Sequence, residues 1–528
     1  MKKILSEVEE RRARLLEGGA TKDIDRQHDR GKLTARERVE LLFDEGSFSE
    51  FDLWIKPLKT GFDIDEREIP GDAVITGFGD INGRRVFVYS HDFTIAGGTF
   101  GTAFHHKVTA VMSMALEKKL PLIQIIDSGG ERIHDSFGRP ANRQILGGRL
   151  PGANTMTMYR APGVISGVVP QITLMLGPMY AGSAYVPTMG DFMIMRNKTA
   201  FMSVASPALL KAVTSQDVTQ DQIGGAQLHA SVTGTADFLM ETDQEALELC
   251  KELVSYLPSN YTEKSPVVDL EDDPCRKDES LLDIIKDDGS YDMHEVIHHI
   301  VDKGKFLELQ SLFAKSMIIG FGRLNGNTVG IVANNPIEEE GVLTIDTCDK
   351  EARFVRFCDA FNIPLIFLAD TKGFRQDINH ERSKEGLIRT AAKPLFAISE
   401  ATVPMMTVYI GKCLGESRLV MGNLRMGVDI TYSWPSAKVA RMNPKEAAEI
   451  IFRDEIKSSN DPDRATSEKE KTLFENYIHY PYHALELGMV NEMIDPRDTR
   501  YILIKGLETL AGKVPLPRPW RKHSLVPH

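Results

Sequence analysis

The chain carries the same sequence pattern twice, and this duplication limits its fold more than any other feature. Residues 73–92 align within residues 316–336 at a constant offset of 243 positions. Within them Ile75, Gly77, Phe78, Gly79, Asn82, Gly83 and Val86 recur as Ile318, Gly320, Phe321, Gly322, Asn325, Gly326 and Val329. Further along, residues 168–183 match residues 402–417 at an offset of 234. A register that is kept over separate segments indicates two copies of one domain.

Each copy shows the alternation of strands and helices that is typical of an α/β fold. The Asn-Gly pairs at 82–83 and 325–326 predict two-residue hairpin turns of type I′. Amphipathic helices are expected at about 103–118 and 349–361. Apolar strands follow in both copies, LPLIQIID with PQITLML and IPLIFLAD with PMMTVYI. This order indicates βαβ units and sheets that are buried on both faces.

The length of 528 residues is too great for one ordinary core, which agrees with two domains. A polar segment with two prolines, residues 259–280, separates the two copies. We therefore expect an N-terminal domain of residues 1–262 and a C-terminal domain of residues 263–528. Residues 1–60 are charged and mostly helical in pattern, so they form an extension of the first domain.

Composition and missing motifs exclude several classes of protein. The net charge of −12 argues against nucleic-acid binding, which needs a basic surface. The start of the chain is charged throughout, and no apolar run reaches about 18 residues, so neither a signal peptide nor membrane insertion is expected. Five cysteines without a CxxC pair favour the reducing cytoplasm and offer no zinc site. P-loop, dinucleotide-binding and HExxH motifs are absent, so phosphoryl transfer, hydride transfer and metal-dependent proteolysis lack support, and no metal is expected.

Short turns with glycine follow the apolar strands in both copies. They are 127–130 (Asp-Ser-Gly-Gly) and 181–183 (Ala-Gly-Ser) in the first copy, and 370–374 (Asp-Thr-Lys-Gly-Phe) and 415–417 (Gly-Glu-Ser) in the second. Gly97-Gly98 adds a fifth turn. Ligands of open α/β sheets bind beyond the C-terminal ends of the strands. Consecutive backbone N–H groups in such turns can bind developing negative charge, so these turns are candidate ligand sites.

Several longer motifs resemble one family. Residues 26–38 (RQHDRGKLTARER), 92–98 (DFTIAGG) and 127–133 (DSGGERI) resemble the carboxyltransferase, or beta, subunits of acyl-CoA carboxylases. This family includes propionyl-CoA carboxylase, methylmalonyl-CoA carboxytransferase and the alpha subunit of methylmalonyl-CoA decarboxylase. The resemblance continues through 224–229 (GGAQLH), 330–334 (GIVAN) and 432–435 (YSWP), nearly from end to end.

The resemblance implies an α/β protein of two tandem crotonase-like domains, each a ββα superhelix, with acyl-CoA bound by the first domain and biotin by the second. Active sites of this family lie between the N-domain of one subunit and the C-domain of another, usually in a hexamer, so the resemblance implies a homo-hexamer or hetero-hexamer. No biotinyl Met-Lys-Met context and no ATP-binding motif occur in this chain. Biotin carboxyl carrier and biotin carboxylase, or a membrane decarboxylase subunit, are therefore expected as separate chains.

The resemblance also assigns roles to the turns. Gly182 and Ser183 would donate backbone N–H groups to the thioester oxygen of acyl-CoA, and Glu416 and Ser417 would donate theirs to the ureido oxygen of biotin. Two preformed oxyanion holes would then stabilise the negative charge that appears on both oxygens during carboxyl transfer. The remaining candidates line the two sites: Gly97, Gly98, Gly129, Gly130, Glu131, Arg132, Ile133 and Ala181 on the acyl-CoA side, and Gly373, Phe374 and Gly415 on the biotin side.

Glu416 and Ser183 depart from the family pattern, because relatives carry glycine there. A carboxylate at 416 is unfavourable beside an oxyanion unless it points away or is neutralised by Arg375 or Arg418. Two other functions stay open. One is a biotin-independent acyl-CoA decarboxylase or hydrolase with Glu416 or Glu131 as acid/base, and the other is a non-catalytic partner subunit.

Overall fold

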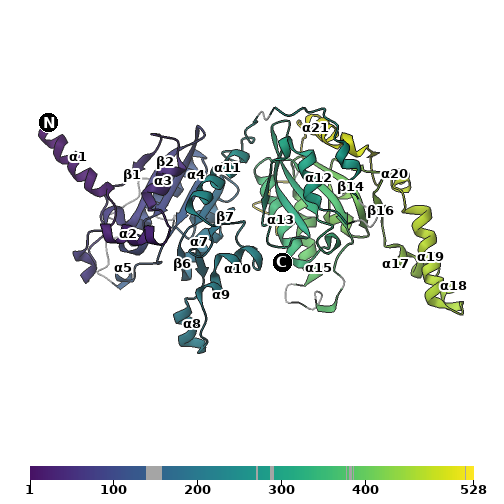
Figure 1. The fold of residues 1–528 in the computed structure, drawn as a ribbon, viewed down its shortest axis with the longest axis horizontal. Coiled ribbons are helices and arrows are strands. Elements are labelled where there is room, and N and C mark those ends of the chain that lie inside the picture. Colours follow the sequence, from purple (N-terminus) through teal and green to yellow (C-terminus); the bar gives the residue numbers. More distant parts are fainter. Residues whose placement is uncertain are drawn as a thin grey trace. The chain divides into compact units, whose positions relative to one another are not determined.

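The computed structural model describes residues 1–137, 157–268, 271–285, 290–375, 377–379, 383, 386–517 and 519–527. The chain divides into two compact units, Met1–Lys264 and Ser265–His528 (Figure 1). The division lies within the polar segment 259–280 and close to the boundary expected from the sequence.

The first unit is built on a sheet in the order β1-β2-β3-β4-β5-β7-β9. Its strands are β1 (Ser49–Phe51), β2 (Val74–Ile81), β3 (Arg84–His91), β4 (Leu122–Ile126), β5 (Gln171–Met175), β7 (Phe192–Arg196) and β9 (Phe238–Met240). β1, β2 and β3 pair antiparallel, and the pairs from β3 to β9 are parallel. A second, two-stranded sheet pairs β6 (Pro178–Tyr180) with β8 (Phe201–Ser203).

The second unit repeats this topology. Its sheet has the order β10-β11-β12-β13-β14-β15-β17, again with an antiparallel start and a parallel remainder. The strands are β10 (Phe306–Leu309), β11 (Met317–Leu324), β12 (Asn327–Asn334), β13 (Leu365–Thr371), β14 (Met405–Leu414), β15 (Ile430–Ser433) and β17 (Glu492–Met493). β16 (Lys438–Ala440) pairs with the end of β14, where the first unit has its β6–β8 pair.

Each unit also contains helices, not all of which have buried residues. In the first unit they are α1 (Lys2–Leu16), α2 (Thr21–Asp29), α3 (Ala35–Leu42), α4 (Thr102–Lys118), α5 (Ile133–Phe137), α6 (Ala161–Ile165), α7 (Tyr185–Thr188), α8 (Pro207–Thr214), α9 (Gln220–Gly224), α10 (Ala226–Ser231) and α11 (Asp243–Tyr256). In the second they are α12 (Met293–Ile300), α13 (Ile345–Ala360), α15 (Leu387–Glu400), α16 (Ser417–Val420), α17 (Pro444–Ile451), α18 (Arg453–Ser458), α19 (Pro462–Tyr477), α20 (Tyr482–Glu486) and α21 (Thr499–Leu510). α4 and α13 are the two amphipathic helices expected from the sequence.

The hairpin turns have the conformation that the sequence predicts. Both central residues have positive φ, 50° and 72° at Asn82 and Gly83 and 50° and 78° at Asn325 and Gly326, as a type I′ turn requires. In the second hairpin both N–H groups donate to the carboxylate of Asp302, at 3.0 and 2.7 Å.

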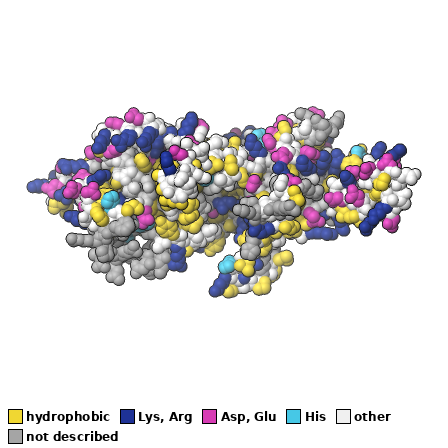
Figure 2. All heavy atoms as spheres, turned by 90° about the horizontal axis from the view of Figure 1, so that it is seen from below, with side chains coloured by type: hydrophobic (Ala, Val, Ile, Leu, Met, Phe, Trp, Pro, Cys, Tyr) yellow, Lys and Arg dark blue, Asp and Glu magenta, His cyan; other side chains and the backbone are white. Residues whose placement is uncertain are grey.

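The core of the first unit lies between α4 and the sheet, where Phe104 and Val108 pack in one cluster with Tyr89 and Leu122. Every residue of β4, β5 and β7 is buried, so both faces of the parallel sheet are covered, as predicted. Among the described residues no helix is long and apolar enough to cross a bilayer. On the face shown in Figure 2, acidic and basic side chains lie intermixed.

Candidate active site

A glycine turn follows β4 in the first unit. The N–H of Gly130, whose φ is 96°, donates to Ser128 Oγ at 2.9 Å. The N–H of Gly129 donates to the carbonyl of Gly97 (2.9 Å), and the N–H of Phe100 donates to the carbonyl of Gly130 (3.1 Å). The predicted turn at 97–98 and the turn after β4 are therefore bonded to each other. We call residues 127–130 the first glycine turn.

The second unit forms the same structure after β13. The N–H of Gly373, with φ of 110°, donates to Thr371 Oγ1 at 3.0 Å. The N–H of Lys372 donates to the carbonyl of Glu340 (3.0 Å), and the N–H of Leu343 donates to the carbonyl of Gly373 (2.9 Å). Each bond corresponds to one in the first unit at the offset of 243. Residues 370–373 form the second glycine turn.

The candidate amide donors of the first unit lie at the start of a short helix. A 3-10 turn, η5 (Ala181–Ala184), runs directly into α7. The N–H groups of the first helical residues, including Gly182 and Ser183, have no intrahelical acceptor and carry the positive end of the helix dipole. The hydroxyl of Ser183 donates back to the carbonyl of Tyr180, so its side chain is turned into the protein. We call Gly182 and Ser183 the first amide pair.

Glu416 and Ser417 form an equivalent second amide pair at the start of α16. Ser417 Oγ donates to the carbonyl of Leu414 at 2.6 Å, as Ser183 does to Tyr180. Glu416 has right-handed helical angles, φ −75° and ψ −15°. The left-handed residue precedes each pair: Ala181 with φ 55° and Gly415 with φ 65°. Glycine is therefore not required at 183 or 416, and these departures from the family pattern do not strain the backbone.

Each unit brings its glycine turn close to its amide pair. In the first unit a methyl group added to Gly130 would lie 3.8 Å from Ser183 Oγ. In the second unit a pocket of about 520 Å³ is shared by Phe374 of the turn region and Glu416 of the amide pair. The other described residues that line it are Arg375, Asp377, Ile378, Leu387, Ile388 and Ala391. From the sequence, the glycine turns and amide pairs are expected to lie together only by analogy with other α/β sheets. The structure shows that they lie close to each other within each unit.

Glu416 is exposed and lines this pocket, so the residue borders the candidate site. The two expected partners do not neutralise it. Arg375 pairs with Glu339, and Arg418 is buried, and among the ion pairs of the described residues none joins either arginine to Glu416. The carboxylate stays available to a ligand in the pocket.

The side chains of residues 131–133 differ in what they can contact. Arg132 is only 3% exposed, and its guanidinium is bound by Asp72 and by the carbonyl of Thr99 (2.7 Å). The guanidinium is therefore already paired within the protein. Arg132 holds the chain in place beside the first glycine turn. Glu131 and Ile133 are exposed and are free to meet a ligand.

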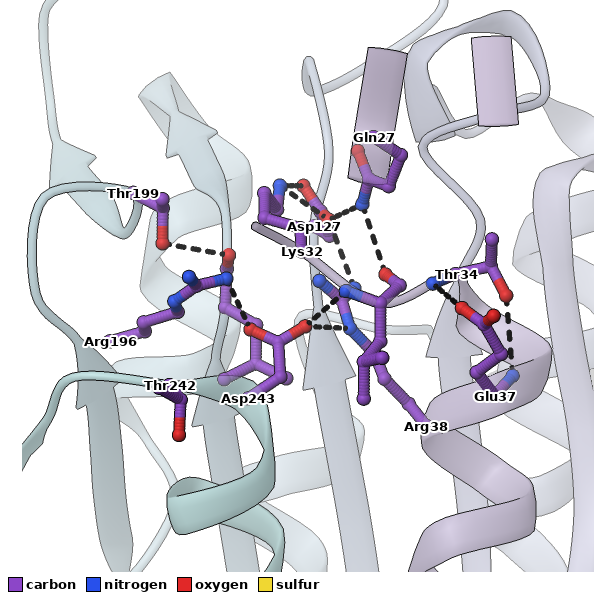
Figure 3. A network of polar contacts seen from close by, with 12 residues as sticks. Gln27, Lys32, Thr34, Glu37, Arg38, Asp127, Arg196, Thr199, Thr242 and Asp243 are labelled. Atoms are coloured by element: carbon purple, nitrogen blue, oxygen red, sulfur yellow. Dashed lines mark hydrogen bonds and ion pairs between the residues drawn. The ribbon is translucent and has the colours of Figure 1, made fainter. Parts of the chain in front are cut away.

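Sequence reasoning gave no role to the residues that surround Asp127 and missed Tyr159. Lys32, Gln27 and Arg38 bind the carboxylate of Asp127 (Figure 3), although all three lie in the motif 26–38 that carries the family resemblance. The Tyr159 hydroxyl would lie 3.9 Å from a methyl group added to Gly182, which places the phenol beside the first amide pair. No local sequence pattern predicts the contacts of Asp127 or the position of Tyr159.

Known proteins resemble this chain over its whole length. The model of the carboxyl transferase domain matches residues 26–526. The carboxyltransferase subunit of propionyl-CoA carboxylase from Haloferax mediterranei is 41% identical, with 99% of each chain covered. The methylmalonyl-CoA carboxyltransferase 12S subunit from Propionibacterium freudenreichii is 41% identical over 99% of this chain and 97% of its own. The alpha subunit of methylmalonyl-CoA decarboxylase from Veillonella parvula is 39% identical over 98% of both.

A solved structure agrees with these relatives. The crystal structure of transcarboxylase 12S, a hexamer with methylmalonyl-CoA and methylmalonic acid bound, superposes with a TM-score of 0.92 at 40% identity and covers 100% of this chain and 98% of its own. The predicted fold of two tandem crotonase-like α/β domains is thereby confirmed. Two copies of one turn-and-amide geometry, on a chain that matches carboxyltransferases from end to end, show that the protein belongs to the carboxyl transferase domain family.

Proposed function

We propose that the chain is the carboxyltransferase component of a biotin-dependent acyl-CoA carboxylase, decarboxylase or transcarboxylase. The observation that carries this proposal is the repeat of one arrangement, a glycine turn beside an amide pair at a helix start, in both units. Carboxyl transfer to or from a thioester develops negative charge on two oxygens, one on each substrate. Two matched sets of N–H donors meet that requirement.

The first unit is assigned to acyl-CoA. A structural relative binds methylmalonyl-CoA, and other relatives are named for propionyl-CoA and methylmalonyl-CoA, so we propose a short-chain acyl-CoA of this kind. The N–H groups of Gly182 and Ser183 would bind the thioester oxygen as it gains enolate charge. Gly129, Glu131 and Ile133 are the exposed members of the neighbouring segment and would contact the ligand.

The second unit is assigned to the biotin of a separate carrier chain. Its pocket has a volume within the range of small-ligand sites, and it is lined by apolar residues of α15 together with Glu416, Arg375 and Asp377. The apolar residues would pack against the compact ring of biotin, while the three charged side chains border it. Biotin, when bound, supplies the nitrogen that carries the carboxyl group. The N–H groups of Glu416 and Ser417 would bind the ureido oxygen.

The chain's own groups orient and stabilise, and no strong side-chain base is needed. Carboxyl transfer would break the bond between the carboxyl carbon and the biotin nitrogen and would form a bond to the α-carbon of the thioester, and the α-proton would pass to that nitrogen. Both amide pairs hold their oxygens throughout. The reverse direction uses the same groups.

Partners and location follow from the same proposal. Carrier and biotin carboxylase, or a membrane-bound decarboxylase subunit, are other chains, and assembly into a hexamer is proposed because transcarboxylase 12S forms one. All five cysteines are unpaired, which suits the reducing cytoplasm.

The test is carboxyl exchange between methylmalonyl-CoA and free biotin, followed by the appearance of propionyl-CoA. Exchange that depends on biotin and is blocked by avidin supports the proposal. Loss of the carboxyl group that avidin leaves undiminished would contradict it and would favour a biotin-independent decarboxylase in which Glu416 or Glu131 acts as acid/base.

A further inference from the structure

Each glycine turn begins with an aspartate whose side chain reaches under the neighbouring strand. A methyl group added to Gly177 would lie 1.8 Å from Asp127 Oδ1, and one added to Gly411 would lie 2.0 Å from Asp370 Oδ2. Only glycine leaves room for these carboxylates. Both glycines lie on the segment that leads to the amide pair of the same unit, so each aspartate packs between its turn and that segment.

In the second unit the carboxylate joins the two segments by hydrogen bonds. The N–H of Lys412, in β14 just before Gly415, donates to Asp370 Oδ1 at 2.8 Å. The hydroxyl of Tyr291 donates to Asp370 Oδ2 at 2.9 Å. Asp370 therefore ties the end of β13, where the second glycine turn begins, to the strand that carries Glu416 and Ser417. Burial raises the pKa of Asp370 to about 6, and these hydrogen bonds partly offset that effect.

In the first unit, charged side chains hold the carboxylate of the corresponding aspartate. Pro178 stands at the position of Lys412 and has no N–H to donate, so the backbone link runs the other way, from the N–H of Ser128 to the Pro178 carbonyl (3.0 Å). The Asp127 carboxylate, fully buried, is held instead by the N-terminal segment: Lys32 at 2.7 Å, with Gln27 and Arg38 each at 2.9 Å (Figure 3).

The donors occupy the same place in the two units. Lys32 shortly precedes α3, and Tyr291 shortly precedes α12; each helix leads into the first strand of its sheet. In the first unit the network extends further, because Arg38 also binds Asp243 (2.8 Å), which in turn binds Arg196 (2.7 Å). Both units therefore place a donor to the aspartate shortly before this helix, a cation in the first unit and a phenol in the second.

We propose that Asp127 and Asp370 are positioning residues, each of which fixes the spacing between the glycine turn and the amide pair of its own unit, and that Gln27 with Lys32, and Tyr291, are the groups that hold them. Preorganised donors stabilise a transition state only when the surrounding residues lock their position. The inference rests on the proposed function for its catalytic meaning, while the spacing itself can be measured without any reaction.

Tyr291→Phe and Gln27→Met each remove one uncharged donor to an aspartate and nearly keep its volume. Tyr409→Phe is the matched control, because its buried hydroxyl bonds to the Gly422 carbonyl and not to Asp370. Hydrogen–deuterium exchange of the full chain is followed in peptides that cover residues 371–375 and 412–417, and in peptides that cover 127–133 and 177–183.

Tyr291→Phe is expected to speed exchange in the 371–375 and 412–417 peptides alone, and Gln27→Met in the 127–133 and 177–183 peptides alone. Equal changes in both units, no change, or the same pattern in Tyr409→Phe would overturn the inference. This readout does not depend on carboxyl transfer, so its failure and that of the proposed function are distinguishable. If Tyr291→Phe does not fold, Asp370→Asn and Asp370→Ala replace it. Asp370→Asn keeps a side chain that can form hydrogen bonds and should show wild-type hydrogen–deuterium exchange. Asp370→Ala removes these hydrogen bonds and should not show wild-type exchange.

If the wild-type protein exchanges carboxyl groups, the same variants should divide the kinetics by substrate. Tyr291→Phe should lower kcat/KM for free biotin by about tenfold and leave the Kd of propionyl-CoA unchanged, because a small displacement of a catalytic group has large kinetic effects. Gln27→Met should instead weaken the binding of propionyl-CoA, which is measured as an increase in its Kd. A uniform loss for both substrates would show a purely structural role and would contradict the assignment.

Discussion

The left-handed residue before each amide pair sets the direction in which the N–H groups point. It is alanine at 181 and glycine at 415, with φ of 55° and 65°. Nothing lies within 4 Å of a methyl group added to Gly415, so a side chain there would cost backbone strain alone. The two units thus contain a natural pair of matched positions with different residues.

Gly415→Ala should destabilise the second unit by about 1 kcal/mol, since a β-carbon disfavours this conformation. Ala181→Gly should have a smaller effect of opposite sign, because relief of strain is offset by the added freedom of the unfolded chain. Urea denaturation of both variants checks the two signs. A stabilised Gly415→Ala variant would be incompatible with the conformation described for this residue.

Glu351 of α13 is a buried carboxyl group without a hydrogen-bond partner at either oxygen. The corresponding residue of the first unit, at the offset of 243, is the core residue Val108. Burial raises the pKa of Glu351 well above its ordinary value of 4.5. The folded state therefore holds a proton that the unfolded state releases at a lower pH.

Glu351→Val should raise the free energy of unfolding by about 1–3 kcal/mol at neutral pH, the cost of burying an unsatisfied polar group. Because the pKa of Glu351 is raised in the folded state, its protonation contributes to the free energy of unfolding of the wild-type protein. This contribution is fully present below pH 4.5 and is lost as pH rises toward the pKa of the folded state. The advantage of the variant should accordingly grow with pH above 4.5. A pH-independent difference, measured by urea denaturation at several pH values, would refute this account.

At the scale of elements, α12 is joined to β10 by a histidine between two carboxylates. The ring of His294 lies 3.0 Å from Glu308 and 2.6 Å from Asp292. The hydrogen bond to Glu308 raises the pKa of His294 to about 9, although burial opposes it and Asp292 adds to it. The pair connects the helix to the edge strand of the second sheet.

Because this pKa is raised, the stabilisation is fully present below about pH 6.5 and is lost as pH rises through about 9. His294→Gln should remove the pH dependence in that window and leave the stability at pH 10 nearly unchanged. Thermal unfolding of the wild-type protein and of the variant between pH 6 and pH 10 measures this pH dependence. A wild-type protein whose second unit is equally stable across this range would contradict the ion pair.

The sequence predicted those elements that local chemistry or the duplication determines. The Asn-Gly hairpins depend on two residues, and the glycine turns follow buried strands in both copies, so the repeat located them. The direction of the Asp127 side chain could not be predicted, because its partners Lys32 and Arg38 lie about 90 residues away in sequence. The burial of Arg132 against Asp72 has the same origin, since it depends on a tertiary contact.

At the scale of the molecule, duplication gives each substrate of a two-substrate reaction an equivalent set of backbone donors. The copies have diverged in what surrounds those donors: a cationic N-terminal clamp on Asp127, a phenol on Asp370, and an exposed carboxylate at Glu416. Backbone N–H groups survive such divergence, because they do not depend on side-chain identity. The central claim is that these N–H groups, and not side-chain acids or bases, stabilise the transition state.

Ser183→Pro tests that claim most directly, with Ser183→Ala as its control. Proline removes the N–H of Ser183, one of the two donors of the first amide pair, and is tolerated in the first turn of a helix. Alanine keeps this N–H and removes only the hydroxyl that bonds to the Tyr180 carbonyl. The measurement is the rate of carboxyl transfer from methylmalonyl-CoA to free biotin, with folding of each variant verified by its thermal unfolding. Loss of one oxyanion donor should lower kcat by about 100-fold in Ser183→Pro and by far less in Ser183→Ala. A folded Ser183→Pro variant with the wild-type rate, or an equal loss in Ser183→Ala, would contradict the account.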